Sequence, residues 1–140
     1  MASEKKYLLL IISIIVIVFS PDQVVGNEKA YHATINDKGV QEVEIIGDSY
    51  YFSPDHIIAK VNIPVEFKIK KNSAGIVPHN IIVDAPEAGI FISEPINVDP
   101  RVIRFTPTKT GKFPFYCDKK LLFFKSHREK GMEGMLQVIR

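Results

Sequence analysis

The sequence predicts an all-β domain, a Greek-key β-sandwich. Short apolar runs alternate with polar residues at the two-residue period of half-buried strands. Clusters of turn-forming residues separate these runs, and nine prolines among the 140 residues would interrupt any long helix. Short strands divided by turns within about 110 residues are typical of two packed antiparallel sheets with Greek-key connections.

Six stretches are the expected strands, and turn clusters lie between them. Four of the stretches alternate apolar and polar positions, and two are shorter apolar runs that begin at His79 or end at Cys117. In chain order the strands are expected over residues 40–47, 65–70, 79–83, 101–107, 112–117 and 135–139. The turns include Gly47-Asp48-Ser49, Ser53-Pro54-Asp55, Asp84-Ala85-Pro86 and Thr110-Gly111-Lys112.

Residues 118–130 have neither strand alternation nor turn punctuation. They could form a helical turn or two, which would be a short helical insertion before the last strand. Four consecutive apolar residues, 121–124, lie within this stretch, and we expect them to pack into the domain or beneath the loop. The alternative is an exposed apolar platform for docking a partner protein. Its basic ring would be Lys119, Lys120, Lys125 and Arg128.

The first 26 residues have the layout of a secretory signal peptide. Lys5 and Lys6 precede an apolar run over residues 8–19 that only Ser13 interrupts, and Gly26 supplies a small residue for cleavage. The run is shorter than the ~20 residues that a spanning helix needs, so cleavage is favoured over an uncleaved membrane tether. We therefore expect an exported, periplasmic or otherwise extracytoplasmic protein. Its parts would be a signal over 1–26, a linker over 27–39 and one domain over 40–140.

Charge divides along the chain. Residues 27–100 carry six Lys or Arg against eleven Asp or Glu, whereas residues 101–140 carry ten against three. The basic excess therefore gathers around Cys117, where it favours an acidic partner or an anionic membrane. A net charge of +2 is too small to indicate nucleic-acid binding.

Cys117 is the single cysteine of the chain. Exported proteins normally pair their cysteines, so this thiol is buried and inert, linked to another chain, or held by a metal. His127 and Met132 follow it closely, with Met135 just behind, and His79 begins an earlier strand. A thiolate, two imidazoles and a distant thioether suit a copper ion that cycles between Cu(I) and Cu(II).

The segments around these residues resemble the cupredoxins, the plastocyanin- and azurin-like blue copper proteins. Pro78-His79-Asn80 is similar to the segment that carries the family's first histidine ligand. Tyr116-Cys117 is similar to the cysteine-bearing end of the penultimate strand. His127-x4-Met132, with Gly131 before the methionine, matches the family's histidine and methionine pattern. The resemblance covers residues 40–140.

This resemblance implies one copper ion with the ligands His79, Cys117, His127 and Met132. It places Met135 on the last strand, away from the axial position, and it makes Asn80 a bridge between the two ligand loops. Nine residues separate Cys117 from His127, which is longer than the family's usual spacing. The loop can still return His127 to the metal if its extra residues bulge outward, because closing a longer loop costs little additional entropy.

The resemblance implies one-electron transfer between larger redox partners, with no catalytic role. A copper chaperone or sensor that handles Cu(I) is an alternative, and it would have a more exposed site and use both Met132 and Met135. A metalloenzyme with zinc or copper is another, although Asp118 and Glu129 are equally explained as loop charges. A hydrolase with a nucleophilic cysteine is least favoured. The two remaining histidines, His32 and His56, are expected at the surface.

Overall fold

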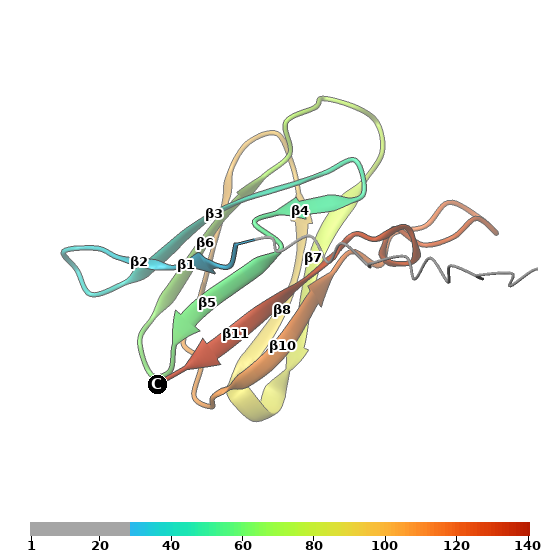
Figure 1. The fold of residues 1–140 in the computed structure, drawn as a ribbon. Coiled ribbons are helices and arrows are strands. Elements are labelled where there is room, and N and C mark those ends of the chain that lie inside the picture. The colour runs from blue at the N-terminus through green and yellow to red at the C-terminus, as the bar shows by residue number, and fades with distance from the viewer. Residues whose placement is uncertain (1–28) are drawn as a thin grey trace, which may run out of the picture.

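The computed structural model describes residues 29–140, which form two packed β-sheets (Figure 1). One sheet has six strands in the order β1-β5-β11-β10-β7-β8. They are β1 (Tyr31–His32), β5 (His56–Lys60), β7 (His79–Ala85), β8 (Ile90–Ile96), β10 (Gly111–Tyr116) and β11 (Glu133–Ile139). The second has the order β2-β3-β6-β9, with β4 paired to β3. Its strands are β2 (Thr34–Ile35), β3 (Gln41–Asp48), β4 (Tyr51–Ser53), β6 (Val65–Lys70) and β9 (Arg101–Phe105).

The Greek-key sandwich predicted from the sequence is confirmed, but the sheets are mixed and not antiparallel throughout. Three pairs run parallel: β1 with β5, β5 with β11, and β3 with β6. The chain crosses to the second sheet between β8 and β9 and returns between β9 and β10. It therefore places β10 beside β7, so that two segments far apart in the sequence become neighbours.

All six predicted strands are present, with ends shifted by a few residues. β8 was not predicted, because Pro95 interrupts its apolar alternation; β8 lies at the edge of its sheet, where a residue without an N–H donor is tolerated. The expected helical insertion reduces to a 3-10 turn, η2 (Arg128–Lys130). A second 3-10 turn, η1 (Pro86–Ala88), joins β7 to β8.

The expected signal peptide over residues 1–26 lies outside the described residues. Part of the expected linker over 27–39 is paired in the sheets: β1 lies against β5 and β2 against β3. Within residues 29–140, no helix has the length and apolar character needed to cross a membrane.

The core lies between the two sheets and is filled by the inward-facing side chains of both. Phe67 on β6 meets Phe105 edge to face at 4.9 Å between ring centroids, and Phe52 meets Phe115 at 5.1 Å. β3 alternates buried and exposed residues along most of its length, as a strand with one face on the core must. This packing fixes the strand ends from which the loops at one end of the sandwich project.

Candidate metal centre

Three buried donor side chains converge at one end of the sandwich. The ligand atoms of His79, Cys117 and His127 all lie within 4.8 Å of one another. The Nδ1 atoms of the two imidazoles are 3.1 Å apart, and Cys117 Sγ is 3.4 Å from His127 Nδ1. The three side chains are at most 5% exposed, which distinguishes this cluster from a chance grouping on the surface.

The sheet brings His79 and Cys117 together. His79 is the first residue of β7, and Cys117 directly follows the end of the antiparallel neighbour β10, where Tyr116 pairs with Ile82. Antiparallel neighbours place the start of one strand beside the end of the other. The backbone N–H of Asn80 also points at Cys117 Sγ, at 3.4 Å.

Backbone hydrogen bonds return His127 to the same point despite the long loop. The N–H of His127 donates to the carbonyl of Lys119 at 2.7 Å, and the N–H of Arg128 donates to the carbonyl of Cys117 at 3.0 Å. We call these two bonds the neck of the loop. Residues 120–126 lie beyond the neck and bulge outward, which is the arrangement that the long spacing between Cys117 and His127 requires.

Met132 is joined through its backbone to the segments that carry two of the donors. Its N–H donates to the carbonyl of His127 at 2.9 Å, and its own carbonyl accepts from the N–H of Cys117 at 3.1 Å. The side chain is fully buried. Met135, by contrast, is a half-buried residue within β11, paired with Pro114 and with His56.

Asn80 joins the two segments that carry the donors. Its amide Nδ2 donates to Asp118 Oδ1 at 2.9 Å, and its Oδ1 accepts from the N–H of Asp118 at 3.2 Å. This is the bridging position expected from the resemblance. It holds the start of β7 against the residue that follows Cys117.

A tight hairpin between β3 and β4 supplies two more side chains at this end. Asp48 pairs with Tyr51 across a two-residue turn of Ser49 and Tyr50, both with positive φ (48° and 67°). Positive φ at both turn positions is the type I′ geometry that suits a hairpin, but it is unfavourable for non-glycine residues. The turn places the Tyr50 ring 4.8 Å from the ring of His127, edge to face. Lys130 Nζ lies over the Tyr50 ring, 4.3 Å from its centroid.

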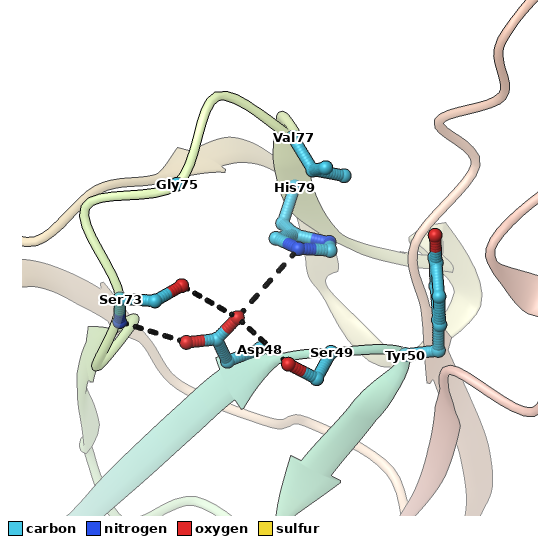
Figure 2. A pocket seen from close by; sticks show the side chains of 7 residues that line it. All are labelled: Asp48, Ser49, Tyr50, Ser73, Gly75, Val77 and His79. Carbon is cyan, nitrogen blue, oxygen red and sulfur yellow. Dashed lines mark hydrogen bonds and ion pairs between the residues drawn. The ribbon is translucent and has the colours of Figure 1, made fainter.

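Asp48 is a buried carboxylate that the sequence did not single out. Its Oδ1 lies 3.9 Å from His79 Nε2, and its oxygens accept hydrogen bonds from Ser49 and Ser73 (Figure 2). The backbone N–H of Asn72 also donates to it. In the sequence, Gly47-Asp48-Ser49 read only as a turn. No signal in the chain order could have found this role, because the groups that hold Asp48 come from a loop more than twenty residues away.

Burial sets the charge states at the site. Burial, and then the proximity of His127, lower the pKa of His79, although Asp48 opposes this shift. Burial, and then Lys130, lower the pKa of His127. Burial raises the pKa of the Cys117 thiol, although the N–H of Asn80 opposes this shift. Burial also raises the pKa of Asp48, but hydrogen bonds from Ser73 and Ser49 outweigh it and leave the pKa below its usual value.

Three solved structures share this architecture. The metal-binding domain of the Cu(I)-exporting P-type ATPase CopA from Streptococcus pneumoniae, solved with Cu(I), superposes with a TM-score of 0.62 at 25% identity, covering 81% of this chain and 98% of that domain. A copper binding protein solved in the apo form gives 0.58 at 20% identity, covering 80% and 99%. Auracyanin B gives 0.53 at 18% identity, covering 77% and 95%. The chain has the cupredoxin fold. No protein-family model and no curated protein matches the sequence.

Within this cupredoxin fold, the donor set fits a single copper ion. Neutral imidazoles bind Cu(I) and Cu(II) alike, and a thiolate favours Cu(I). The lowered pKa values of both histidines leave their lone pairs free, whereas the thiol must lose its proton when a metal binds. His32 is exposed, as expected, and His56 is half-buried with its Nε2 3.1 Å from Gln137 Oε1, so neither contributes to this donor cluster.

The outer face of the same end is apolar and exposed. The expectation that residues 121–124 pack into the domain is wrong: Leu122 is 73% exposed and Phe123 is 89% exposed. The neck explains their exposure, because its two hydrogen bonds close the loop at its base and keep residues 121–124 away from the core. Ile76 on the neighbouring loop is 99% exposed. A cavity of about 400 Å³ lies between the two loops, with His127 and Tyr50 in its lining.

Proposed function

We propose that this protein binds one copper ion through His79, Cys117, His127 and Met132 and exchanges single electrons with a larger redox partner. The observation that carries the proposal is the donor cluster, in which three buried ligand atoms lie within 4.8 Å of one another. Met132 is included because it is fully buried and hydrogen-bonded through its backbone to both His127 and Cys117.

A cluster whose ligands are held rigidly suits electron transfer because the two copper oxidation states prefer different geometries. Where hydrogen bonds fix the ligands, little can rearrange when the charge changes. Here the neck, the side-chain bridge of Asn80 and the backbone bonds of Met132 hold the ligand segments together. Catalysis is less well supported, because the nearby carboxylates Asp48 and Asp118 are both hydrogen-bonded to neighbouring residues that hold the loops together.

The test is to add Cu(II) to the purified protein and record visible absorption and electron paramagnetic resonance spectra. We expect an intense thiolate-to-copper charge-transfer band, absent in Cys117→Ser. The hyperfine splitting reports how far the long loop shifts the geometry from that of ordinary blue copper. Binding of zinc alone, or of no metal, would show that the cupredoxin fold has another use here.

Carriage of Cu(I) is the second candidate, favoured by the Cu(I)-bound domain of an exporting ATPase among the structural neighbours. A carrier needs a site that opens to release its ion, and it could recruit Met135 as well as Met132. The burial of the donors supports the electron-transfer proposal over this one.

Methionine variants separate the two candidates. For electron transfer, Met132→Leu shifts the reduction potential, because the axial ligand tunes it, and Met135→Leu leaves the potential unchanged. For a carrier, both variants speed the loss of Cu(I) to a chelator such as bicinchoninate. A wild-type protein that yields Cu(I) to the chelator within the mixing time would favour carriage.

The exposed end of the molecule is the docking face in this proposal. Its apolar residues and the cavity beside His127 lie over the donor cluster, and exposed basic side chains surround them. The basic residues are Lys119, Lys120, Lys125, Arg128 and Lys130. An apolar patch with a basic rim suits a redox protein with an acidic docking surface, and His127 would be the shortest route for the electron. The N-terminal sequence favours a place outside the cytoplasm.

A further inference from the structure

Asp48 is held in place by more hydrogen bonds than a turn requires. It is the last residue of β3 and only 6% exposed. Oδ2 accepts from the backbone N–H groups of Asn72 and Ser73, at 3.1 and 2.8 Å. Oδ1 accepts from the hydroxyl of Ser73 at 3.1 Å and from that of Ser49 at 3.4 Å. The carboxylate is therefore fixed from the hairpin on one side and from the loop before β7 on the other.

The carboxylate of Asp48 faces one nitrogen of the His79 ring, and the other nitrogen of that ring faces the donor cluster. Oδ1 lies 3.9 Å from His79 Nε2 (Figure 2). Nδ1 of the same ring lies 3.1 Å from His127 Nδ1. Both partners are buried, so solvent screens their interaction little. At 3.9 Å the contact is one of charge and not a hydrogen bond, and the nearby negative charge favours the tautomer that carries its proton on the remote nitrogen.

We propose that Asp48 is a positioning residue for the copper site: it keeps the proton of His79 on Nε2, so that Nδ1 is free to bind, and its negative charge lowers the reduction potential of the copper. The inference rests on the proposed function. Cu(II) carries one more positive charge than Cu(I), so a nearby anion stabilises the oxidised state more than the reduced state. Asp48 reaches the metal only through His79 and is not itself a ligand.

A purely structural role for Asp48 is the competing explanation. The carboxylate also ties the hairpin to the loop at residues 72–73, and that tie alone would stabilise the fold. Such a role affects the free energy of unfolding, but it does not require a shift in potential of a defined sign. The two explanations therefore differ in what they predict for the metal.

The first measurement is the reduction potential of the copper-loaded protein. Asp48→Asn removes the charge at nearly constant size, and we expect the potential to rise. Asp48→Glu keeps the charge and should recover at least part of the wild-type value. Glu44→Gln makes the same charge change on the same strand, at an exposed side chain paired with Lys68, and should leave the potential unchanged. A potential for Asp48→Asn equal to that of Glu44→Gln would overturn the proposal.

The second measurement needs no metal and so separates this inference from the proposed function. Nitrogen-15 NMR of the metal-free protein identifies which nitrogen of His79 carries the proton. We expect Nε2 in the wild type and an increased Nδ1-protonated fraction in Asp48→Asn. If Asp48→Asn does not fold, the wild type alone decides: a proton on Nε2 supports the proposal, and a proton on Nδ1 overturns it. If copper gives no charge-transfer band, the proposed function fails while this measurement still tests Asp48.

Discussion

The imidazoles of His79 and His127 and the thiol of Cys117 lie together in a buried cluster, and at neutral pH each group is favoured in its uncharged form. Burial lowers the pKa of both histidines and raises that of the cysteine. Three neutral donors can lie in contact without the repulsion that two imidazolium groups would introduce. The metal-free cluster is therefore compatible with the folded state, and acid should disrupt it.

The lowered pKa values of His79 and His127 predict an acid-sensitive metal-free protein. The unfolded chain takes up protons as the pH falls below about 6.5, whereas the folded protein resists protonation. The stabilising contribution is thus present above this pH and is lost as the pH falls toward the lower pKa of the folded state. Urea unfolding of the metal-free protein at several pH values between about 5 and 8 measures it.

The control for this pH effect is a histidine outside the cluster. His32→Gln changes an exposed residue and should leave the pH profile as in the wild type. His79→Gln removes a titrating group and should flatten the profile. An unfolding free energy that is independent of pH in the wild type would contradict the burial of neutral imidazoles.

The residues that could be predicted are those with a distinctive type and order. A single cysteine, His127-x4-Met132 and Pro78-His79-Asn80 are rare enough together to indicate a site. Asp48 could not be predicted, because an aspartate beside a glycine and a serine is common in turns. Its role depends on hydrogen bonds from Asn72 and Ser73, which only the folded chain brings near.

At the scale of elements, β11 carries the strongest steric restriction near the site. Gly134 pairs with Phe115 on β10, and a Cβ at this position would overlap the Phe115 ring and the backbone carbonyl of Asp55. The ring could turn, but a backbone carbonyl cannot move without shifting β5. The absence of a side chain lets β11 pass close enough to these neighbours to pair with β10 on one side and β5 on the other.

Gly134→Ala should therefore destabilise the protein by about 1–3 kcal/mol, the range for overpacking a filled interior. Equilibrium denaturation in urea measures the change. Gly75→Ala is the matched control, because a Cβ there approaches only Ser73 Oγ, at 3.6 Å, and its effect should stay within about 0.5 kcal/mol. Equal stabilities for the two variants would show that β11 can shift away from β5.

Elements with a regular apolar period were predictable, and short or interrupted ones were not. β3 and β6 show their alternation directly, whereas β4 has three residues and β1 and β2 have two each. Two or three residues contain too little of a pattern to separate from a turn. The parallel pairs could not be predicted either, because side-chain period is the same for both strand directions.

At the scale of the molecule, one end holds the donors, the apolar residues and much of the basic charge. We expect electron exchange to be faster with the anion hexacyanoferrate(II) than with the cation hexaammineruthenium(II) after correction for driving force, and more so at low salt. Favourable steering of this kind changes association rates by about tenfold or more. Stopped-flow kinetics at several ionic strengths measures the effect.

A shortened loop supplies the matched variant for that experiment. Replacing residues 120–125 with one glycine leaves Lys119-Gly-Ser126-His127, a four-residue turn that the existing bond from the His127 N–H to the Lys119 carbonyl would close. The copper spectrum should be unchanged, while exchange with hexacyanoferrate slows because Lys120 and Lys125 are lost. An unchanged rate with copper still bound would remove the loop from the docking face.

The neck has a practical consequence. A loop that two backbone hydrogen bonds close at its base can be replaced by another loop without changing the residues on the other side of those bonds. Peptides of many lengths and sequences could be grafted between Lys119 and His127. Each would lie close to the metal site, so that a ligand binding to the peptide would change the absorption spectrum and the reduction potential of the metal. The loop is therefore a natural insertion point for an electrically readable sensor.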